Sequence, residues 1–167
     1  MVILITGASH TGKTVLARKL VEKFHYSCLS IDHLKMGLIR SGYTDLTVYD
    51  DDALTAYLWP ILREMVKTAI ENRQDLILEG CYIPFDWKKD FGPEYLKQIQ
   101  YRCLVMTRDY IEGNRERILA HANDVEQRLD SEPDWEWLIR ENQQNLELCR
   151  QYDCPVILVD KDYRVEF

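Results

Sequence analysis

Long apolar runs are missing from this 167-residue sequence. Spanning a bilayer takes about 20 consecutive apolar residues, and no segment approaches that length. The apolar start, MVILI, is too short for a signal peptide and runs directly into a glycine-containing motif. The sequence therefore predicts a soluble, cytoplasmic protein with no membrane partner.

Positive charge and paired cysteines are also scarce. The chain has 21 Lys and Arg against 28 Asp and Glu, a formal net charge of −7, which argues against a broad basic surface for nucleic acid. Its five cysteines show no CxxC spacing: Cys28, Cys81, Cys103, Cys149 and Cys154. An odd, scattered set predicts reduced thiols rather than a disulfide framework or a zinc module.

Internal repeats, low-complexity tracts and Pro/Gly/Ser-rich linkers are absent as well. With 46% hydrophobic residues, a chain of this length can bury one substantial core. The sequence thus predicts a single domain over residues 1–167.

Short apolar runs alternate with segments of helical period. The runs predict five strands, at Val2–Thr6, Tyr26–Ile31, Asp75–Glu79, Gln100–Met106 and Pro155–Asp160. The periodic segments predict helices at Lys13–Phe24, His33–Arg40, Asp50–Arg73 (with a kink or break at Pro60), Tyr110–Leu129 and Trp135–Tyr152. Strands separated by helices pair in parallel with right-handed crossovers, so the expected fold class is a three-layer α/β protein.

The most informative motif is GASHTGKT, which follows the first strand and opens the first helix. We expect its glycines to let successive N–H groups converge on an anion, aided by the helix N-terminus. Lys13 can then reach the β- and γ-phosphates, and the Thr14 hydroxyl can bind magnesium. The predicted nucleotide-binding residues are Gly7, Ala8, Ser9, His10, Thr11, Gly12, Lys13 and Thr14.

With this motif the chain resembles the P-loop kinases of nucleosides and small molecules, a group that includes adenylate, shikimate and gluconate kinases and proteins labelled 2-phosphoglycerate kinase. The resemblance covers the whole length in layout and rests on GASHTGKT, SID, LILEG and RDYIEGNRERI. It implies a five-stranded parallel sheet of order 2-3-1-4-5, with ligands beyond the carboxyl ends of the strands. It also implies ATP and Mg²⁺, an acceptor-side segment at about residues 32–73 and a lid at about residues 108–130.

Two acids gain roles from this resemblance. Asp32, after the second strand, would orient an acceptor hydroxyl and take its proton, although it could instead be the N-cap of the next helix. Glu79, at the end of the third strand, would act through magnesium-bound water, or could simply face solvent.

Four arginines lie in a charged stretch after the fourth strand: Arg108, Arg115, Arg117 and Arg128. The resemblance implies that Arg115 or Arg117 neutralises charge on the transferred phosphoryl group and that Arg108 stacks on adenine. Because Arg115 and Arg117 are two residues apart, they point in different directions on a helix. A solvated helix surface is the alternative.

The sequence therefore favours a kinase that transfers the γ-phosphoryl group of ATP to a small-molecule hydroxyl. A nucleoside monophosphate kinase is the first alternative, weakened because Glu79–Pro84 lacks the arginine that would hold an acceptor phosphate. A nucleotide-binding switch or regulatory ATPase is the second, although the chain has no Asn-Lys-x-Asp motif.

Overall fold

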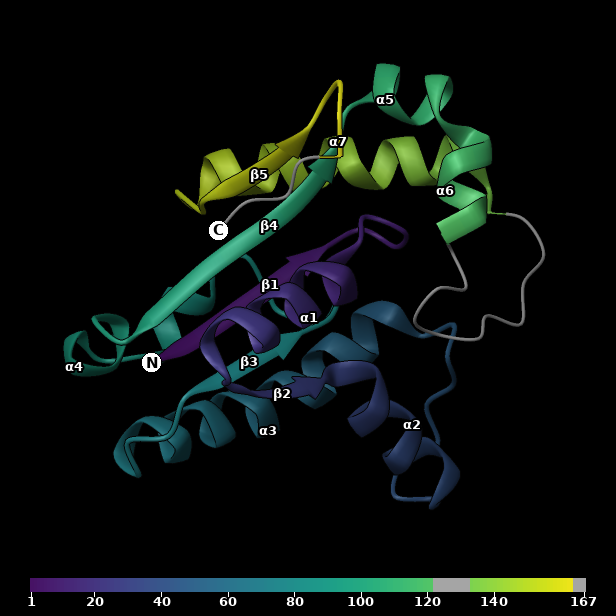
Figure 1. Cartoon of the computed structure of the whole chain (residues 1–167). Helices are drawn as coiled ribbons and strands as arrows, with labels where there is room; N and C mark the ends of the chain where they lie inside the picture. Colours follow the sequence, from purple (N-terminus) through teal and green to yellow (C-terminus); the bar gives the residue numbers. More distant parts are fainter. Residues whose placement is uncertain (122–132, 164–167) are drawn as a thin grey trace.

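A five-stranded parallel sheet forms the centre of the protein (Figure 1). The computed structural model describes residues 1–121 and 133–163. The strands are β1 (Val2–Gly7), β2 (Ser27–Ser30), β3 (Leu76–Glu79), β4 (Ile99–Met106) and β5 (Val156–Val159). Their order is β2-β3-β1-β4-β5, which confirms the predicted sheet and its order.

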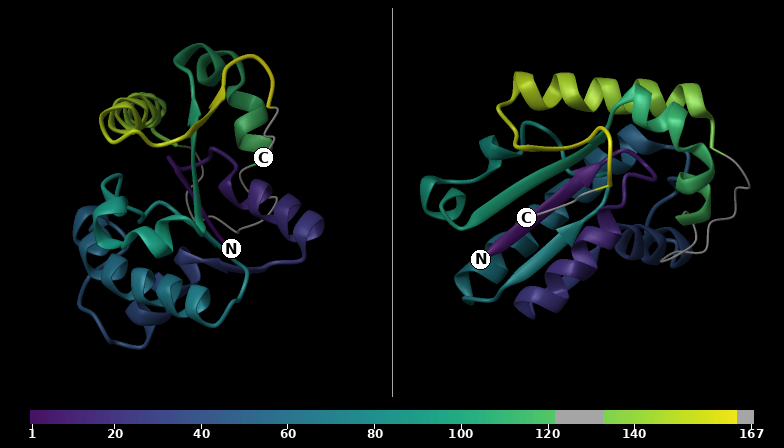
Figure 2. Two further views of the ribbon diagram at one scale, coloured as in Figure 1. Left: turned by 90° about the vertical axis from the view of Figure 1, so that its left-hand side faces the viewer. Right: turned by 45° about the horizontal axis from the view of Figure 1, so that its top comes forward.

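Helices pack on both faces of this sheet, as the end-on view in Figure 2 shows. The helical elements are α1 (Lys13–Phe24), α2 (Ile31–Arg40), α3 (Asp51–Glu71), the 3-10 helix η1 (Trp87–Asp90), α4 (Pro93–Leu96), α5 (Arg108–Gly113), α6 (Arg115–His121) and α7 (Trp135–Gln151). In the left panel of Figure 2, α1 lies on one side of the sheet while α3 and α7 lie on the other. The predicted three-layer α/β architecture is therefore confirmed.

The two faces of β1 serve two separate cores. Val2 and Leu4 pack in a cluster with the apolar side chains of α3, whereas Ile3 and Ile5 pack in a second cluster with α1. Side chains alternate between the faces of a strand, so a strand buried on both faces is apolar throughout. This burial holds β1 in the middle of the sheet and so fixes the position of the loop that follows it.

Two helices differ from their predicted form. Helix α2 begins at Ile31, with Ser30 as its N-cap, so Asp32 lies in the first turn and the N-cap interpretation of Asp32 is wrong. Helix α3 continues through Pro60, and the break expected there does not occur. Pro60 is exposed, and the flanking Leu58, Trp59 and Leu62 are buried, so packing against the sheet offsets the lost backbone hydrogen bond.

The single helix predicted at Tyr110–Leu129 is wrong in its first half, and its residues 122–129 lie outside the described residues. The chain leaves helical geometry at Asn114, whose side-chain amide donates to the Tyr110 carbonyl at 2.9 Å. Asparagine competes with the backbone in this way, so α5 ends and α6 starts anew. The short helices η1 and α4 were not predicted.

No helix within residues 1–121 and 133–163 combines the length and apolarity needed to cross a membrane.

Candidate functional site

The candidate site lies where β1 and β3 end. The chain leaves β1 toward α1 and β2 on one side, and leaves β3 toward β4 on the other, so the sheet order reverses between these strands. In open α/β sheets ligands bind beyond the carboxyl ends of the strands at such a point. Both GASHTGKT and Glu79 occupy this edge.

The loop between β1 and α1 is held by hydrogen bonds to a single carbonyl. The Thr11 hydroxyl and the Lys13 ammonium both donate to the Ala8 carbonyl oxygen, each at 2.8 Å. His10 has a φ of 62°, a left-handed conformation that is uncommon for a residue with a side chain. The loop therefore has a defined conformation in which Lys13 folds back over it.

Gly12 is the N-cap of α1 and adopts a left-handed φ of 84°. A Cβ atom at this position would collide with the hydroxyl of Tyr163, which donates to the carbonyl oxygens of Gly12 at 3.1 Å and Thr11 at 3.3 Å. Tyr163 follows β5 and lies 151 residues away in the chain. Only the place of Tyr163 after the last strand could have pointed to this contact.

Lys13 is only 8% exposed, but it stays cationic. Burial by itself favours the neutral amine and lowers the pKa of Lys13. Cys81, Glu79 and Asp32 act in the opposite direction and together leave the pKa above its ordinary value. The predicted residues Lys13, Glu79 and Asp32 are thus brought into one electrostatic group.

Thr14 and Glu79 fit the expected magnesium site. The Thr14 hydroxyl donates to Glu79 Oε2 at 3.4 Å, and Glu79 is buried at 2% exposure. Magnesium prefers oxygen ligands and keeps several waters, which suits one hydroxyl beside one carboxylate next to a phosphate loop. The solvent-facing alternative for Glu79 is wrong, because the carboxylate is buried. No cluster of three or more His, Cys, Asp or Glu suited to a metal occurs in the parts of the chain that the structure describes.

Asp32 belongs to a chain of polar contacts that sequence reasoning missed. Lys35, one turn along α2, forms an ion pair with Asp32 and donates to the Tyr82 hydroxyl at 3.0 Å. Tyr82 in turn donates to Asp51 Oδ1 at 3.2 Å. The lysine ammonium also lies 4.9 Å from the centre of the Tyr82 ring. The i, i+3 spacing of Asp32 and Lys35 was visible in the sequence, but the partners on α3 and beyond β3 were not.

Glu141 on α7 is a further acid that the sequence did not single out. Its neighbour Asn142 is buried and accepts from the Met106 backbone N–H at 2.8 Å, which fastens α7 to the end of β4. Burial raises the pKa of Glu141, and the positive charge of Lys13 and a hydrogen bond from the Ser9 backbone oppose that rise. One carboxylate oxygen, Oε2, is buried without a hydrogen-bond partner. Glu141 therefore reaches the phosphate loop from the opposite face of the sheet to α1.

The three predicted arginines lie on α5 and α6 and are exposed. Arg108 pairs with Glu112 at 3.0 Å and approaches Glu136 of α7 at 4.0 Å. The Arg115 guanidinium lies 5.3 Å from the centre of the Trp135 ring, a cation–π contact. The rest of the expected lid, residues 122–130, lies outside the described residues, so the roles of Arg108, Arg115 and Arg117 stay predictions.

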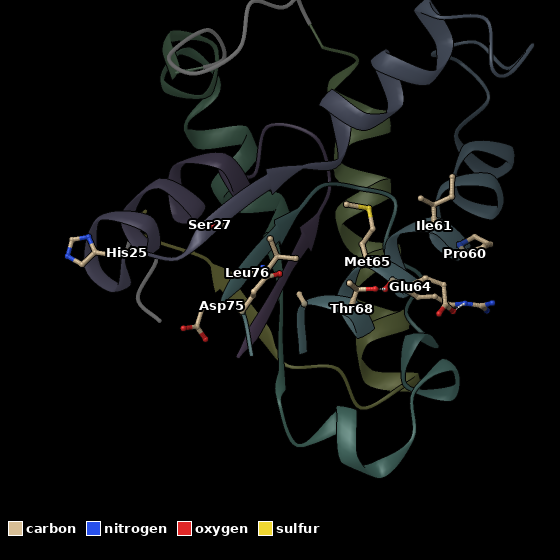
Figure 3. Close-up of a pocket in the computed structure, with 12 residues that line it drawn as sticks. His25, Ser27, Pro60, Ile61, Glu64, Met65, Thr68, Asp75 and Leu76 are labelled. Atoms are coloured by element: carbon tan, nitrogen blue, oxygen red, sulfur yellow. Dashed lines mark hydrogen bonds and ion pairs between the residues drawn. The ribbon is translucent and has the colours of Figure 1, made fainter. Parts of the chain in front are cut away.

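A groove of about 1070 Å³ lies at the opposite edge of the sheet (Figure 3). His25 and Ser27 line one side, and Ile61 and Met65 of α3 line the other. Its charged groups are already paired within the protein: Arg63 with Glu64 at 3.0 Å, and Asp75 with the N-terminal ammonium at 2.7 Å. The groove has no phosphate loop beside it and contains none of the predicted site residues.

No protein-family model matches the chain, and no curated protein matches it in sequence. Solved structures do match along almost its whole length. A gluconokinase from Sinorhizobium meliloti 1021 has a TM-score of 0.54 at 15% identity and covers 97% of this chain and 83% of its own. A deoxyadenosine kinase from M. mycoides has a TM-score of 0.54 at 18% identity, covering 96% and 90%. A sugar kinase from Janibacter sp. HTCC2649 has a TM-score of 0.52 at 16% identity, covering 95% and 84%.

The fold is that of the P-loop kinases. At these levels of identity the likeness concerns the arrangement of strands and helices, and confirms the resemblance drawn from GASHTGKT and the strand order. It does not extend to the acceptor, since function depends on the side chains placed on a fold.

Proposed function

We propose that this protein is an ATP- and Mg²⁺-dependent kinase that transfers the γ-phosphoryl group to the hydroxyl of a small molecule. The observation that carries the proposal is the geometry at the phosphate loop, where Lys13 folds back onto the Ala8 carbonyl and Glu79 accepts from Thr14 at 3.4 Å, with Asp32 in the same electrostatic group. A phosphate-binding cation, a metal-site acid and an acid for the acceptor are the groups that phosphoryl transfer requires. One deoxyadenosine kinase of the same fold was solved with dATP bound, which supports a nucleotide in this position.

Each residue has a distinct part in this proposal. The loop from Gly7 to Thr14 binds the triphosphate through its backbone N–H groups, and the cationic Lys13 leaves the Ala8 carbonyl to contact the phosphates. Thr14 and Glu79 would hold magnesium, which neutralises phosphate charge when bound.

Asp32 orients the acceptor hydroxyl and takes its proton as the new bond to phosphorus forms. Its position in the first turn of α2, 33% exposed at the side chain, leaves one face open to an acceptor. Arg115 or Arg117 would neutralise charge on the transferred group, and Arg108 would contact the base. The acceptor is a small molecule rather than a nucleic acid, because the chain is acidic overall.

The decisive experiment measures phosphoryl transfer from labelled ATP with magnesium to a panel of nucleosides, sugars, hydroxy acids and nucleoside monophosphates. Wild type is compared with Asp32→Asn and with Asp45→Asn, which removes an exposed acid on the loop before α3. We expect transfer to a hydroxyl compound that falls about 100-fold or more in Asp32→Asn and is unchanged in Asp45→Asn.

Two other results would replace this function. Transfer to a nucleoside monophosphate that survives Asp32→Asn would indicate a monophosphate kinase. Tight ATP binding with no transfer to any acceptor would indicate a nucleotide-binding switch or regulatory ATPase. Thermal unfolding of each variant, with and without ATP, separates these outcomes from a loss of folding.

A further inference from the structure

The acceptor side of the site carries an excess of negative charge. Three carboxylates lie on this side: Asp32 of α2 and Asp51 of α3 are joined through Lys35 and Tyr82, and Glu141 of α7 accepts from the Ser9 backbone of the phosphate loop. Asp32 influences Lys13, and Asp51 influences Glu141, so these acids share one electrostatic environment. We call these three acids and Lys35 the acceptor-side cluster.

Lys35 is the cation of this cluster, and its charge is already balanced by Asp32. Its ammonium is paired with Asp32 and donates to Tyr82, and its side chain is only 12% exposed. Burial lowers the pKa of Lys35, but the hydrogen bonds to Asp32 and Tyr82 outweigh burial and raise it. Lys35 is therefore permanently cationic, and an anionic ligand would have to compete with Asp32 for it.

The other two acids, Asp51 and Glu141, form no ion pair among the described contacts of the cluster. Asp51 accepts a hydrogen bond from a neutral phenol, at 3.2 Å from Tyr82. Glu141 accepts from the Ser9 backbone, and its second oxygen is buried without a hydrogen-bond partner. The positive charge of Lys13 favours ionised Glu141, but the triphosphate occupies Lys13 in the proposed reaction. An ionised Glu141 repels an anion, and a protonated one does not attract it.

We propose that the phosphoryl acceptor of this enzyme carries no negative charge at neutral pH. This inference rests on the proposed kinase function. Three carboxylates against one paired lysine give the cluster a net charge of −2 when all are ionised, from −3 and +1. A carboxylate or phosphate ester on the acceptor would add a like charge at short range in a partly buried site. Nucleosides, sugars, alditols and amino alcohols fit this class, whereas gluconate and nucleoside monophosphates do not.

The test uses pairs of acceptors that share a carbon skeleton and differ in charge. Sorbitol and 1-amino-1-deoxysorbitol are compared with gluconate, glycerol and serinol with glycerate, and deoxyadenosine with its 3′-monophosphate, which keeps the 5′-hydroxyl free. Transfer from labelled ATP with magnesium gives kcat/KM for each member. We expect the uncharged or cationic member of any pair that reacts to exceed the anionic member by about tenfold or more.

Substitutions in the cluster test whether these acids cause the preference for uncharged over anionic acceptors. Glu141→Gln keeps the shape of the side chain and removes its charge, so the ratio of uncharged to anionic kcat/KM should fall several-fold. Asp51→Asn should lower the same ratio. Glu147→Gln, an exposed acid on the same helix, is the matched control and should leave the ratio unchanged.

Three results would count against the inference, and they differ from one another. A higher kcat/KM for the anionic members would overturn it while the kinase function stands. A ratio that both Glu141→Gln and Asp51→Asn leave unmoved would show that the cluster does not select the acceptor. Transfer to no acceptor at all would overturn the kinase function, and this inference with it.

Discussion

The nucleotide side and the acceptor side of this site meet at one edge of the sheet but are built from different parts of the chain. On the nucleotide side, the proposed binding elements lie in eight consecutive residues: the loop N–H groups, the helix terminus and a single lysine. On the acceptor side, the groups are side chains from α2, α3, α7 and the loop after β3, which are distant in the sequence.

This difference explains why the two sides behave differently under substitution. The phosphate loop at residues 7–14, which we call the cradle, binds mainly through backbone groups. Such a loop tolerates changes at most of its side chains and depends on a few residues that permit its conformation or carry charge. A side-chain network depends on each member, because removing one partner leaves the other unsatisfied. The nucleotide side should therefore fail at single critical positions, and the acceptor side should weaken gradually.

The largest effect is expected from Lys13→Ala. This change removes the cation that the loop presents to the phosphates, so transfer should fall by about 1000-fold or more. Labelled-ATP assays measure the rate, and titration with ATP analogues measures the affinity. Lys19→Ala, an exposed lysine on the same helix, is the control and should retain full activity. A loss of less than tenfold in Lys13→Ala would mean that the cradle does not need its lysine.

A smaller, acceptor-specific effect is expected from Lys35→Met. The change leaves Asp32 without its counter-charge and Tyr82 without a donor, so kcat/KM for the acceptor should fall about 10- to 100-fold. ATP affinity should not change. Lys67→Met is matched to it, because Lys67 pairs with Glu64 at the same i, i+3 spacing but on α3 away from the loop. Equal losses in ATP affinity and acceptor kcat/KM would contradict the division into two sides.

The same division explains what the sequence could predict. GASHTGKT and the alternation of strands and helices identified the cradle and the sheet, because both depend on local patterns within short windows. Asp32 and Glu79 were singled out as candidates because each comes at or after the end of a strand. Three contacts were not predicted: Glu141 with Ser9, Tyr163 with Gly12, and Lys35 with Tyr82. Each forms between residues 47 or more positions apart in the chain. Asn114, which separates α5 from α6, was missed because one side-chain hydrogen bond overrides a helical pattern.

The boundary between the two sides gives a third prediction. Gly80, which follows Glu79, has a φ of 155°, and a Cβ atom there would lie 2.7 Å from the Cβ of Ile31 in α2. Gly80→Ala should therefore lower the free energy of unfolding by about 1–3 kcal/mol. Gly37→Ala, within α2 and with open space around it, should instead raise it by about 0.5–1 kcal/mol. Urea denaturation of both variants measures the difference, and equal stabilities would show that α2 can move away from β3.

The smallest effects are expected from two matched substitutions that each remove one tyrosine hydroxyl, one on each side of the site. Tyr163→Phe removes the hydrogen bonds to the Gly12 and Thr11 carbonyls, which connect the phosphate loop to the segment after β5. A neutral hydrogen bond contributes about 0.5–1.5 kcal/mol, so the dissociation constant for ATP should rise about 2- to 12-fold.

Tyr82→Phe removes one hydroxyl of the acceptor side in the same way, but should leave ATP affinity unchanged and lower only acceptor kcat/KM. Calorimetric titration with a non-hydrolysable ATP analogue and magnesium tests both variants. If Tyr82→Phe weakens ATP binding as much as Tyr163→Phe does, the two sides are coupled through Lys13 and Asp32. The acceptor-side acids would then set the charge of the whole site, and the nucleotide cradle could not be treated as an independent unit.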